Sequence, residues 1–316
     1  MLRLVIETFI AIVGFILGIT LLVVSSDKAV EYSIKIATTL GISPFIVGLV
    51  LVSIGTDLPE IANSIVSSAA GHGDINVGDS LGSVLTQITL VLGLIALLSK
   101  DFRVKRKEII VIGTCLILAL ILAVSIARRG YISRSDAFIL MVSWPVFMFI
   151  TQRLTQKDVK KNFVYQYKRN SQLDFLIAVL GFVGVAVGAY VLIQSIIKLS
   201  DTFNVSEYLL SFFLVSIGTS IPELIVDLTA IRKKEYELAI GDIIGSCIVD
   251  ATVSIGIGNL FFPNFISGNL AMITGFYAII ASIFVITTLL WRKKLDKDAG
   301  KFFIFIYLFS FTMLSI

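Results

Sequence analysis

The feature that most constrains this sequence is a succession of apolar stretches, each close to the roughly 20 residues that an α-helix needs to cross a bilayer. They lie at about residues 4–24, 37–70, 77–99, 108–127, 135–152, 173–197, 207–231, 238–262, 268–291 and 302–316. With 57% hydrophobic and 15% charged residues, the chain is neither a soluble globular domain nor a disordered segment. We therefore predict an all-α integral membrane protein with ten transmembrane helices.

The basic residues fall unevenly on the two sides of these helices. The loops after the first, third, fifth, seventh and ninth stretches carry 21 of the 26 Lys and Arg, and the other side carries 5. Because Lys and Arg accumulate in cytoplasmic loops, this predicts a multi-pass protein of the cell membrane with both termini outside. The first stretch lacks a small-residue cleavage site and is expected to stay as a helix. The basic loops are a topology signal, so no nucleic-acid partner is expected.

A ten-residue segment occurs twice, as LVSIGTDLPE at residues 51–60 and as LVSIGTSIPE at residues 214–223, at an offset of 163 residues. The same offset relates further pairs, namely Gly78-Asp79 with Gly241-Asp242 and Gly82-Ser83 with Gly245-Ser246. A register kept over this length indicates an internal duplication.

The duplication has a consequence for topology, because five predicted helices precede the second half and an odd number inverts its direction in the membrane. We predict two inverted five-helix repeats, residues 1–152 and 173–316, joined by a short basic cytoplasmic linker at residues 153–172. Inverted repeats are typical of secondary transporters, whose ion sites lie on interrupted helices near the bilayer midplane.

Within the two repeated regions, residues 51–87 and 214–250, seven of the 22 acidic residues fall inside the apolar stretches, and no Lys or Arg lies at comparable depth. They are Asp57, Glu60, Asp79, Glu223, Asp227, Asp242 and Asp250. An ionised group at the centre of a transmembrane helix costs about 2.5 to 3.5 kcal/mol on insertion scales. These carboxylates must therefore face an aqueous cavity, be protonated, or be neutralised by a bound cation.

Other oxygen-bearing side chains extend these acidic positions into four stripes, each on one helix face. The stripes are Ser53, Thr56 and Glu60; Ser216, Thr219 and Glu223; Asp79, Ser83 and Gln87; and Asp242, Ser246 and Asp250. Pro59 and Pro222 lack an amide hydrogen, so the carbonyl four residues earlier loses its helical partner and can meet an ion. Hard oxygen ligands suit Ca²⁺ and, with fewer charges, Na⁺, whereas zinc and copper prefer imidazole or thiolate.

The few softer ligands in the sequence do not change this assignment. The single histidine, His72, falls in a short external loop, where we expect it to be solvated. Cys115 and Cys247 lie in apolar runs and are expected to be buried without forming a disulfide or a metal site. Any proton coupling would therefore have to use carboxylates.

These motifs resemble those of the cation/Ca²⁺ exchanger superfamily, in particular the prokaryotic Na⁺/Ca²⁺ exchangers. The resemblance rests on two copies of a G-T-S-x-P-E motif, each followed by G-N-x-x-G-S and a polar residue four positions on, and it covers both halves. It implies exchange of Na⁺ for Ca²⁺ by alternating access through four clustered ion sites, without a cofactor. It also implies that Glu60 and Glu223 are the central Ca²⁺ ligands, aided by the Thr56 and Thr219 carbonyls. The implied Na⁺ ligands are Ser220, Ser83, Ser246, Asp250 and the carbonyls of Ser53 and Ser216.

The sequence departs from the family motifs where a site residue would be expected. Asp57 stands where the motif has Ser, Asp79 and Asp242 replace the usual Asn, and Gln87 stands where Asn is common. Asp227 adds a carboxylate one turn beyond Glu223. This extra negative charge raises affinity for cations or for protons and leaves the coupling ion and the stoichiometry open.

Three other functions are compatible with parts of the sequence. Ca²⁺/H⁺ or another cation/H⁺ antiport, coupled through Asp57, would use the surplus carboxylates. A cation channel would use the same oxygen ligands. An intramembrane aspartyl protease would need a Gly-x-Gly-Asp signature, of which Gly241-Asp242 supplies only the second half. The predicted partners are thus Ca²⁺, Na⁺ or H⁺ and the lipid bilayer, and the oligomeric state stays open, with a monomer compatible with the sequence.

Overall fold

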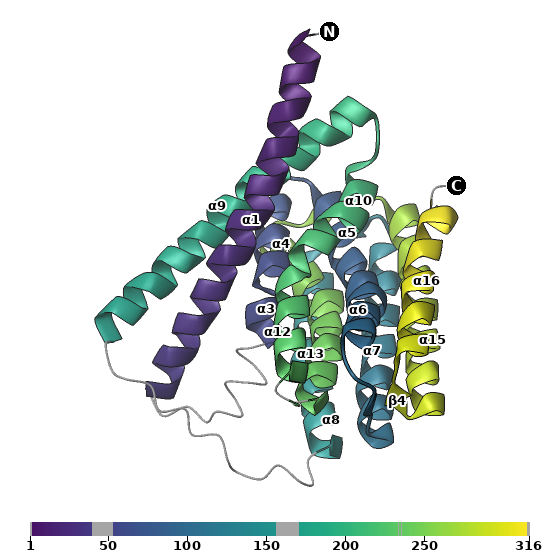
Figure 1. The fold of residues 1–316 in the computed structure, drawn as a ribbon. Helices are drawn as coiled ribbons and strands as arrows, with labels where there is room; N and C mark the ends of the chain where they lie inside the picture. Colours follow the sequence, from purple (N-terminus) through teal and green to yellow (C-terminus); the bar gives the residue numbers. More distant parts are fainter. Residues whose placement is uncertain (1, 40–52, 156–170, 233, 235, 315–316) are drawn as a thin grey trace.

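The computed structural model describes residues 2–39, 53–155, 171–232, 234 and 236–314 of the chain, and these residues are almost entirely helical (Figure 1). The α-helices are α1 (Leu2–Thr39), α3 (Ser53–Thr56), α4 (Leu58–Ala69), α5 (Gly73–Leu85), α6 (Leu92–Leu98), α7 (Arg106–Ala127), α8 (Arg134–Thr155), α9 (Ser171–Phe203), α10 (Glu207–Leu210), α11 (Ser216–Thr219), α12 (Ile221–Arg232), α13 (Tyr236–Val249), α14 (Ile255–Phe261), α15 (Gly268–Arg292) and α16 (Lys297–Leu314). Three π-helical segments are η2 (Thr86–Val91), η3 (Ser211–Val215) and η4 (Asp250–Ser254). Four two-residue strands are β1 (Phe102–Arg103), β2 (Tyr131–Ile132), β3 (Asn264–Phe265) and β4 (Lys294–Leu295).

Eight helical segments within the described residues are long and apolar enough to cross a membrane, and they coincide with eight of the ten predicted stretches. The predicted second stretch, 37–70, falls partly outside the described residues. The tenth corresponds to α16, whose first turns carry the charges of Lys297, Asp298 and Lys301. An all-helical membrane fold is therefore confirmed, while the count of ten stays a prediction.

The position predicted for the end of the first helix is wrong. The sequence predicts a loop after residue 24, but α1 continues to Thr39. This extension is polar, and the Lys28 ammonium donates to Glu31 at 3.0 Å, three residues along the same helix face. Charged residues that pair along one face can thus continue a helix beyond its apolar part.

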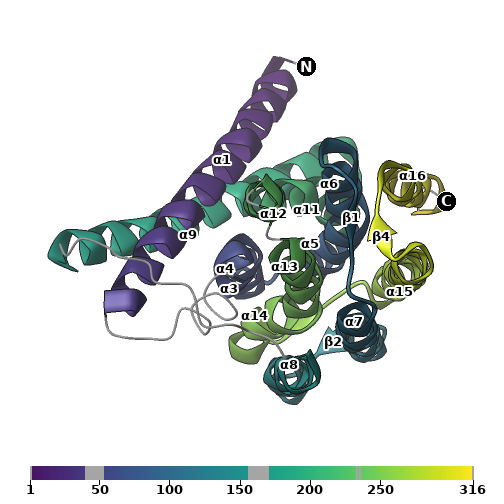
Figure 2. The same cartoon turned by 60° about the horizontal axis from the view of Figure 1, so that its bottom comes forward.

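Helices α1 and α9 pack against each other and stand at one side of the bundle formed by the other helices (Figure 1, Figure 2). Two glycines allow their backbones to approach. A Cβ atom on Gly18 would lie 2.8 Å from the Leu192 nitrogen, and one on Gly188 would lie 2.8 Å from the Leu22 nitrogen. Each residue of α1 in these contacts has its counterpart 170 positions later in α9, so the two helices present equivalent surfaces to each other.

The most deeply buried helices are the two continuous runs α5–η2–α6 and α13–η4–α14. Figure 2 shows α5 and α13 in the middle of the bundle, with α7, α8, α15 and α16 along one side. Leu81 and Ile88 on the first run and Ile243 and Ile248 on the second are fully buried. Most of the buried polar residues singled out from the sequence lie on these same runs or on the interrupted helices beside them.

The interruptions occur at positions that the sequence repeat relates. A break at Asp57 separates α3 from α4, and a break at Ser220, 163 residues later, separates α11 from α12. The π-helical segments η2 and η4 end at Val91 and Ser254, which have the same offset. The breaks agree with the interrupted helices predicted from the prolines, whereas nothing in the sequence predicted the π-helical segments.

Two short antiparallel ladders join the two halves of the chain. Strand β1 pairs with β4, with Phe102 opposite Leu295, and β2 pairs with β3, with Tyr131 opposite Phe265. The repeat offset of 163 residues relates β2 to β4, and it relates β1 to β3 to within one residue. Exchanging the halves therefore converts one ladder into the other, as expected if a pseudo-twofold axis relates them.

Candidate ion-binding site

The broken helices place two glutamates at equivalent points of the fold. Asp57 occupies the turn before α4, and Glu60 lies in the first turn of that helix. In the second half, Ser220 occupies the turn and Glu223 lies in the first turn of α12. Pro59 and Pro222 stand in these first turns, where a residue without an amide hydrogen costs no helical hydrogen bond. The positive end of each short helix then favours the negative charge of its glutamate.

Three carboxylates converge from these two breaks. Asp57, Glu60 and Glu223 are all buried, and one oxygen of each lies within 4.8 Å of the others. Three carboxylates at this separation repel one another strongly in a medium of low polarity. The cluster therefore has the charge and spacing to surround a single cation.

Hydroxyl groups connect this cluster to α5. The Ser83 hydroxyl donates to Glu60 Oε1 at 3.4 Å and lies 3.4 Å from the Thr219 hydroxyl. Thr219 in turn donates to Asp79 Oδ1 at 3.2 Å. The network joins residues from both halves, because α5 carries Ser83 and Asp79 whereas α11 carries Thr219.

The partner helix α13 and its π-helical continuation supply the other side of the cluster. Asp250 is buried at the start of η4, where the Ser254 hydroxyl donates to its Oδ1 at 3.2 Å. Ser246 lies beside Asp57. Gln87, the repeat counterpart of Asp250, accepts a hydrogen bond from the Cys247 thiol at 3.4 Å. Cys247 is buried as predicted and contacts a predicted site residue, a contact that the sequence did not indicate.

Many oxygens of this cluster have no hydrogen-bond partner among the residues that the structure describes. Both oxygens of Asp57 and of Glu223, Oε2 of Glu60 and Oδ2 of Asp250 are buried in this way. None of the ion pairs among the described residues includes these four side chains. Since removing an unpaired carboxylate from water costs several kcal/mol, the arrangement is that of a site for a positively charged ligand.

The remaining predicted residues fall into three groups. Thr56, Ser216 and Ser220 are buried next to the breaks, and the Ser216 hydroxyl lies 3.2 Å from that of Thr86. Asp227 and Asp242 are also buried, one helical turn from Glu223 and Ser246. Ser53 begins α3, but its side chain lies outside the described residues.

Sequence reasoning missed Asn63, which is fully buried on α4 and donates through Nδ2 to Asp79 Oδ2 at 2.5 Å. A signal was available, because Asn63 follows Glu60 by three residues and therefore lies on the same helix face. Its repeat counterpart is Val226, so a search for residues shared by the two repeats passes over it.

A family model described as sodium/calcium exchanger protein matches residues 10–152 and 173–316. The chain belongs to the sodium/calcium exchanger family. It is 30% identical to inner membrane protein YrbG of Escherichia coli, over 90% of each chain. It is 25% identical to sodium/calcium exchanger MaX1 of Methanosarcina acetivorans, over 78% of this chain and 82% of the other. Another relative, putative antiporter CaxA of Alkalimonas amylolytica, is 32% identical over 81% of this chain and 82% of its own.

Solved structures of the exchanger NCX_Mj have the same fold as this family member. One, from crystals soaked with Na⁺ and Sr²⁺, superposes with a TM-score of 0.64 at 26% identity and covers 96% of this chain and 98% of the other. The resemblance inferred from the motifs is thus confirmed. The family is one of multi-pass membrane transporters of the cation/Ca²⁺ antiporter class, so the chain is not an enzyme and the protease alternative is wrong.

One expectation about this exchanger-family chain needs correction. His72 is not simply solvated, because its Nδ1 lies 2.8 Å from Glu207 Oε2 and its side chain is only 30% exposed. The contact joins the turn before α5 to the start of α10, two segments far apart in the sequence. The two residues are 135 positions apart, so no local sequence pattern predicts their contact.

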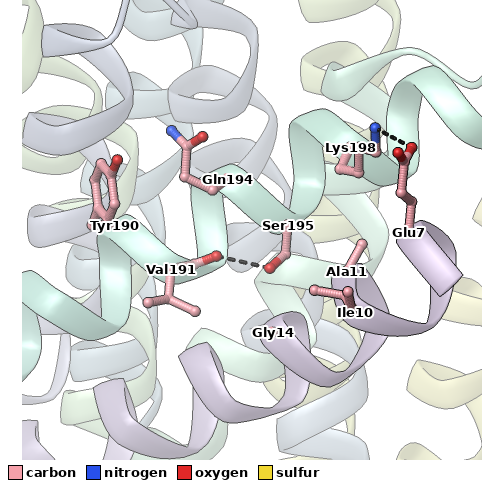
Figure 3. A pocket seen from close by; sticks show the side chains of 9 residues that line it. All are labelled: Glu7, Ile10, Ala11, Gly14, Tyr190, Val191, Gln194, Ser195 and Lys198. Atoms are coloured by element: carbon pink, nitrogen blue, oxygen red, sulfur yellow. Dashed lines mark hydrogen bonds and ion pairs between the residues drawn. The ribbon is translucent and has the colours of Figure 1, made fainter.

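A surface pocket of this exchanger-family chain lies away from the carboxylates, between α1 and α9 (Figure 3). Its lining is mostly apolar and includes Ile10 and Val191, and a Lys198–Glu7 ion pair of 2.8 Å lies at one end. Phe9, Leu17 and other apolar side chains on the outer face of α1 are exposed, as expected of a surface that contacts lipid. The pocket therefore belongs to the lipid-facing surface and not to the ion site.

Proposed function

We propose that this chain is a Na⁺-driven Ca²⁺ antiporter that works by alternating access. The observation that carries the proposal is the buried cluster of Asp57, Glu60 and Glu223, whose carboxylates meet within 4.8 Å with no basic partner among the described residues. Carboxylate oxygens with hydroxyl and backbone oxygens nearby are the ligands that Ca²⁺ prefers. Neighbouring hydroxyls on Ser83, Ser220 and Ser246 would suit Na⁺ once Ca²⁺ has left.

Flux through purified protein in lipid vesicles tests this proposal. Vesicles loaded with Na⁺ and diluted into Na⁺-free medium are expected to take up radioactive Ca²⁺, and vesicles loaded with choline are not. Glu60→Gln and Glu223→Gln each remove a charged oxygen ligand and are expected to reduce uptake to that of protein-free vesicles. Asp201→Asn, which changes an exposed carboxylate on α9, serves as a control and should keep the uptake of the original chain. Ca²⁺ uptake that is independent of any counter-ion would indicate a channel and overturn the proposal.

A second candidate function is Ca²⁺/H⁺ or another cation/H⁺ exchange, and it is favoured by Asp57. The equivalent position in the second half is the neutral Ser220, so the first half adds one carboxylate that could carry a proton. In this case an imposed pH gradient should drive Ca²⁺ uptake without Na⁺. Asp57→Ser should then alter the pH dependence of uptake, and the reciprocal swap Asp57→Ser with Ser220→Asp should restore it. A pH profile that does not change in Asp57→Ser would remove Asp57 as the coupling group.

The proposal extends to the organisation of the chain in the cell membrane. It takes residues 1–152 and 173–316 as inverted repeats and places the linker 153–172 and the other basic loops in the cytoplasm, with both termini outside. Support comes from the paired breaks at Asp57 and Ser220 and from the exchange of β1–β4 with β2–β3. Most of the linker lies outside the described residues.

A further inference from the structure

The central cluster does not account for Asp227, which lies on α12 one turn beyond Glu223. Asp227 has no exposed surface, and neither of its carboxylate oxygens has a hydrogen-bond partner among the residues that the structure describes. The opposite face of α12 is open, with Ile225 56% exposed and Ile221 36% exposed. Asp227 therefore points toward the inside of the bundle, where an unpaired carboxylate is costly.

Two charged groups among the described residues act on Asp227, and both are acidic. Asp242 on α13 and Asp57 at the first break both interact with it electrostatically, and they interact with each other. Helices α12 and α13 pack against each other, and Asp227 and Asp242 interact electrostatically from these two helices. We call these two residues the α12–α13 acidic pair.

The α12–α13 acidic pair lies closer to one surface of the protein than the central cluster does. Asp227 is five residues from Arg232, and Asp242 is six from Tyr236, so at 1.5 Å per residue each is roughly 8 Å from its helix end. Glu223, nine residues from Arg232, is roughly 14 Å from the same end. The pair thus stands between the central cluster and the face that carries Arg232.

The equivalent place in the other half of the molecule is hydrogen-bonded. There, Asp79 accepts hydrogen bonds from Asn63 at 2.5 Å and from Thr219 at 3.2 Å. Val226 takes the place of Asn63 in the second half, so the second half has no equivalent amide. The counterpart of Asp227 is Ser64, whose hydroxyl accepts a hydrogen bond from the Gly258 backbone at 3.1 Å. One approach to the cluster therefore has the hydrogen-bonded hydroxyl of Ser64, whereas the other has the carboxylate of Asp227, which has no hydrogen-bond partner among the described residues.

We propose that the α12–α13 acidic pair holds a second hard cation, Ca²⁺ or Na⁺, between the central cluster and the face that carries Arg232. The proposal rests on the central cluster being the transport site. The second cation balances the charge of Asp227. It gives the protein a cation-loading step on one face that the other face lacks.

Equilibrium binding of radioactive Ca²⁺ and Na⁺ to the purified full-length protein in detergent tests the site without requiring transport. Asp227→Ser introduces the residue found at the equivalent position of the first half. It should bind about one cation fewer per chain than the original protein, whereas Glu60→Gln should lose central binding and keep this additional cation. Asp242→Asn is a second variant in case Asp227→Ser does not fold, and Asp201→Asn is the control. Loss of one Ca²⁺ or of one Na⁺ identifies the occupant, and loss of neither overturns the proposal.

Flux measured from each side of oriented vesicles provides the second readout. In Asp227→Ser the half-saturating Ca²⁺ concentration should rise about tenfold on the face that carries Arg232, equivalent to about 1.4 kcal/mol. It should stay the same on the opposite face. An equal rise on both faces would make Asp227 part of the central site and refute a separate one. If the original chain shows no exchange at all, the proposed function fails, while the binding measurement still decides the second site.

Discussion

Buried carboxylates in this protein fall into two kinds according to their partners. Both oxygens of Asp79 receive hydrogen bonds, from Asn63 and Thr219. Among the described residues, Glu60 and Asp250 each have one oxygen without a donor, and Asp57 and Glu223 have two. A carboxylate with donors around it stabilises the fold, and one without donors costs free energy unless a ligand supplies the positive charge. Counting donors around each acid therefore separates structural acids from candidate ligands.

Asp296, in the connection between β4 and α16, is a buried carboxylate with donors around it that lies outside the membrane-spanning helices. Its carboxylate accepts hydrogen bonds from Arg292 at 2.5 Å, from Lys294 at 2.9 Å and from the Ala299 backbone at 3.0 Å. Burial opposes ionisation, but these donors outweigh it and hold the pKa of Asp296 well below its usual range. Ionised Asp296 thus stabilises the folded state.

We expect Asp296→Asn to lower the free energy of unfolding at neutral pH by roughly 1 to 3 kcal/mol, the usual contribution of hydrogen bonds to charged groups. Because the pKa is lower in the folded state, this contribution is present above the unfolded pKa of about 3.9 and is lost as the pH falls through the folded value. Thermal unfolding in detergent should therefore show a deficit at pH 7 that shrinks toward pH 3. Asp298→Asn, at a carboxylate that is 74% exposed, is the matched control. A deficit that is the same at both pH values would contradict this account.

Among the elements, the α1–α9 crossing depends on small residues in a repeated order. Gly18 and Gly188 meet the backbone of the partner helix, while Gly14 meets side-chain atoms, of which the hydroxyl of Ser195 is the nearest. Without a hydrophobic driving force between helices in lipid, close backbone packing supplies much of their association. The two kinds of glycine should therefore differ in their tolerance of a side chain.

Gly18→Ala and Gly188→Ala should each destabilise the protein by about 1 to 3 kcal/mol, the typical cost of overpacking, since an added Cβ meets backbone that cannot rotate away. Gly14→Ala should cost less, because the Ser195 hydroxyl can turn aside. Thermal unfolding of the three variants in detergent measures the difference. Equal losses at Gly14 and Gly18 would show that the backbone contact is not what matters.

At the level of the whole molecule, hydropathy, charge and the sequence repeat were enough to predict a helical membrane fold with breaks near Pro59 and Pro222. The carboxylates Glu60 and Glu223 could be predicted to approach each other, because the repeat brings equivalent positions together. Asn63 could not be found in this way, since it has no counterpart in the second half. The His72–Glu207 contact and the π-helical segments depend on packing between distant segments, which no local pattern records.

The orientation of the molecule in the membrane can be tested with single cysteines at the two ends of α7. Asp101 lies beside β1, on the side expected to be cytoplasmic, and Tyr131 lies in β2 on the opposite side. The two variants are Asp101→Cys and Tyr131→Cys. A membrane-impermeant maleimide applied to intact cells should label Tyr131→Cys, and should label Asp101→Cys only after permeabilisation. The unchanged chain, whose Cys115 and Cys247 are buried, gives the background. The reverse pattern would place the termini in the cytoplasm.

The two ladders and the helix packing cross from one half of the chain to the other, with β1 paired to β4, α7 packed on α15 and α1 on α9. Each half therefore completes its packing against the other, although each contains a full copy of the repeat. During synthesis the ribosome releases Asp79 long before Thr219, the hydroxyl that hydrogen-bonds it. A newly inserted first half therefore stays in the bilayer with its acids incompletely hydrogen-bonded. It reaches its native packing only after the second half has been synthesised and inserted.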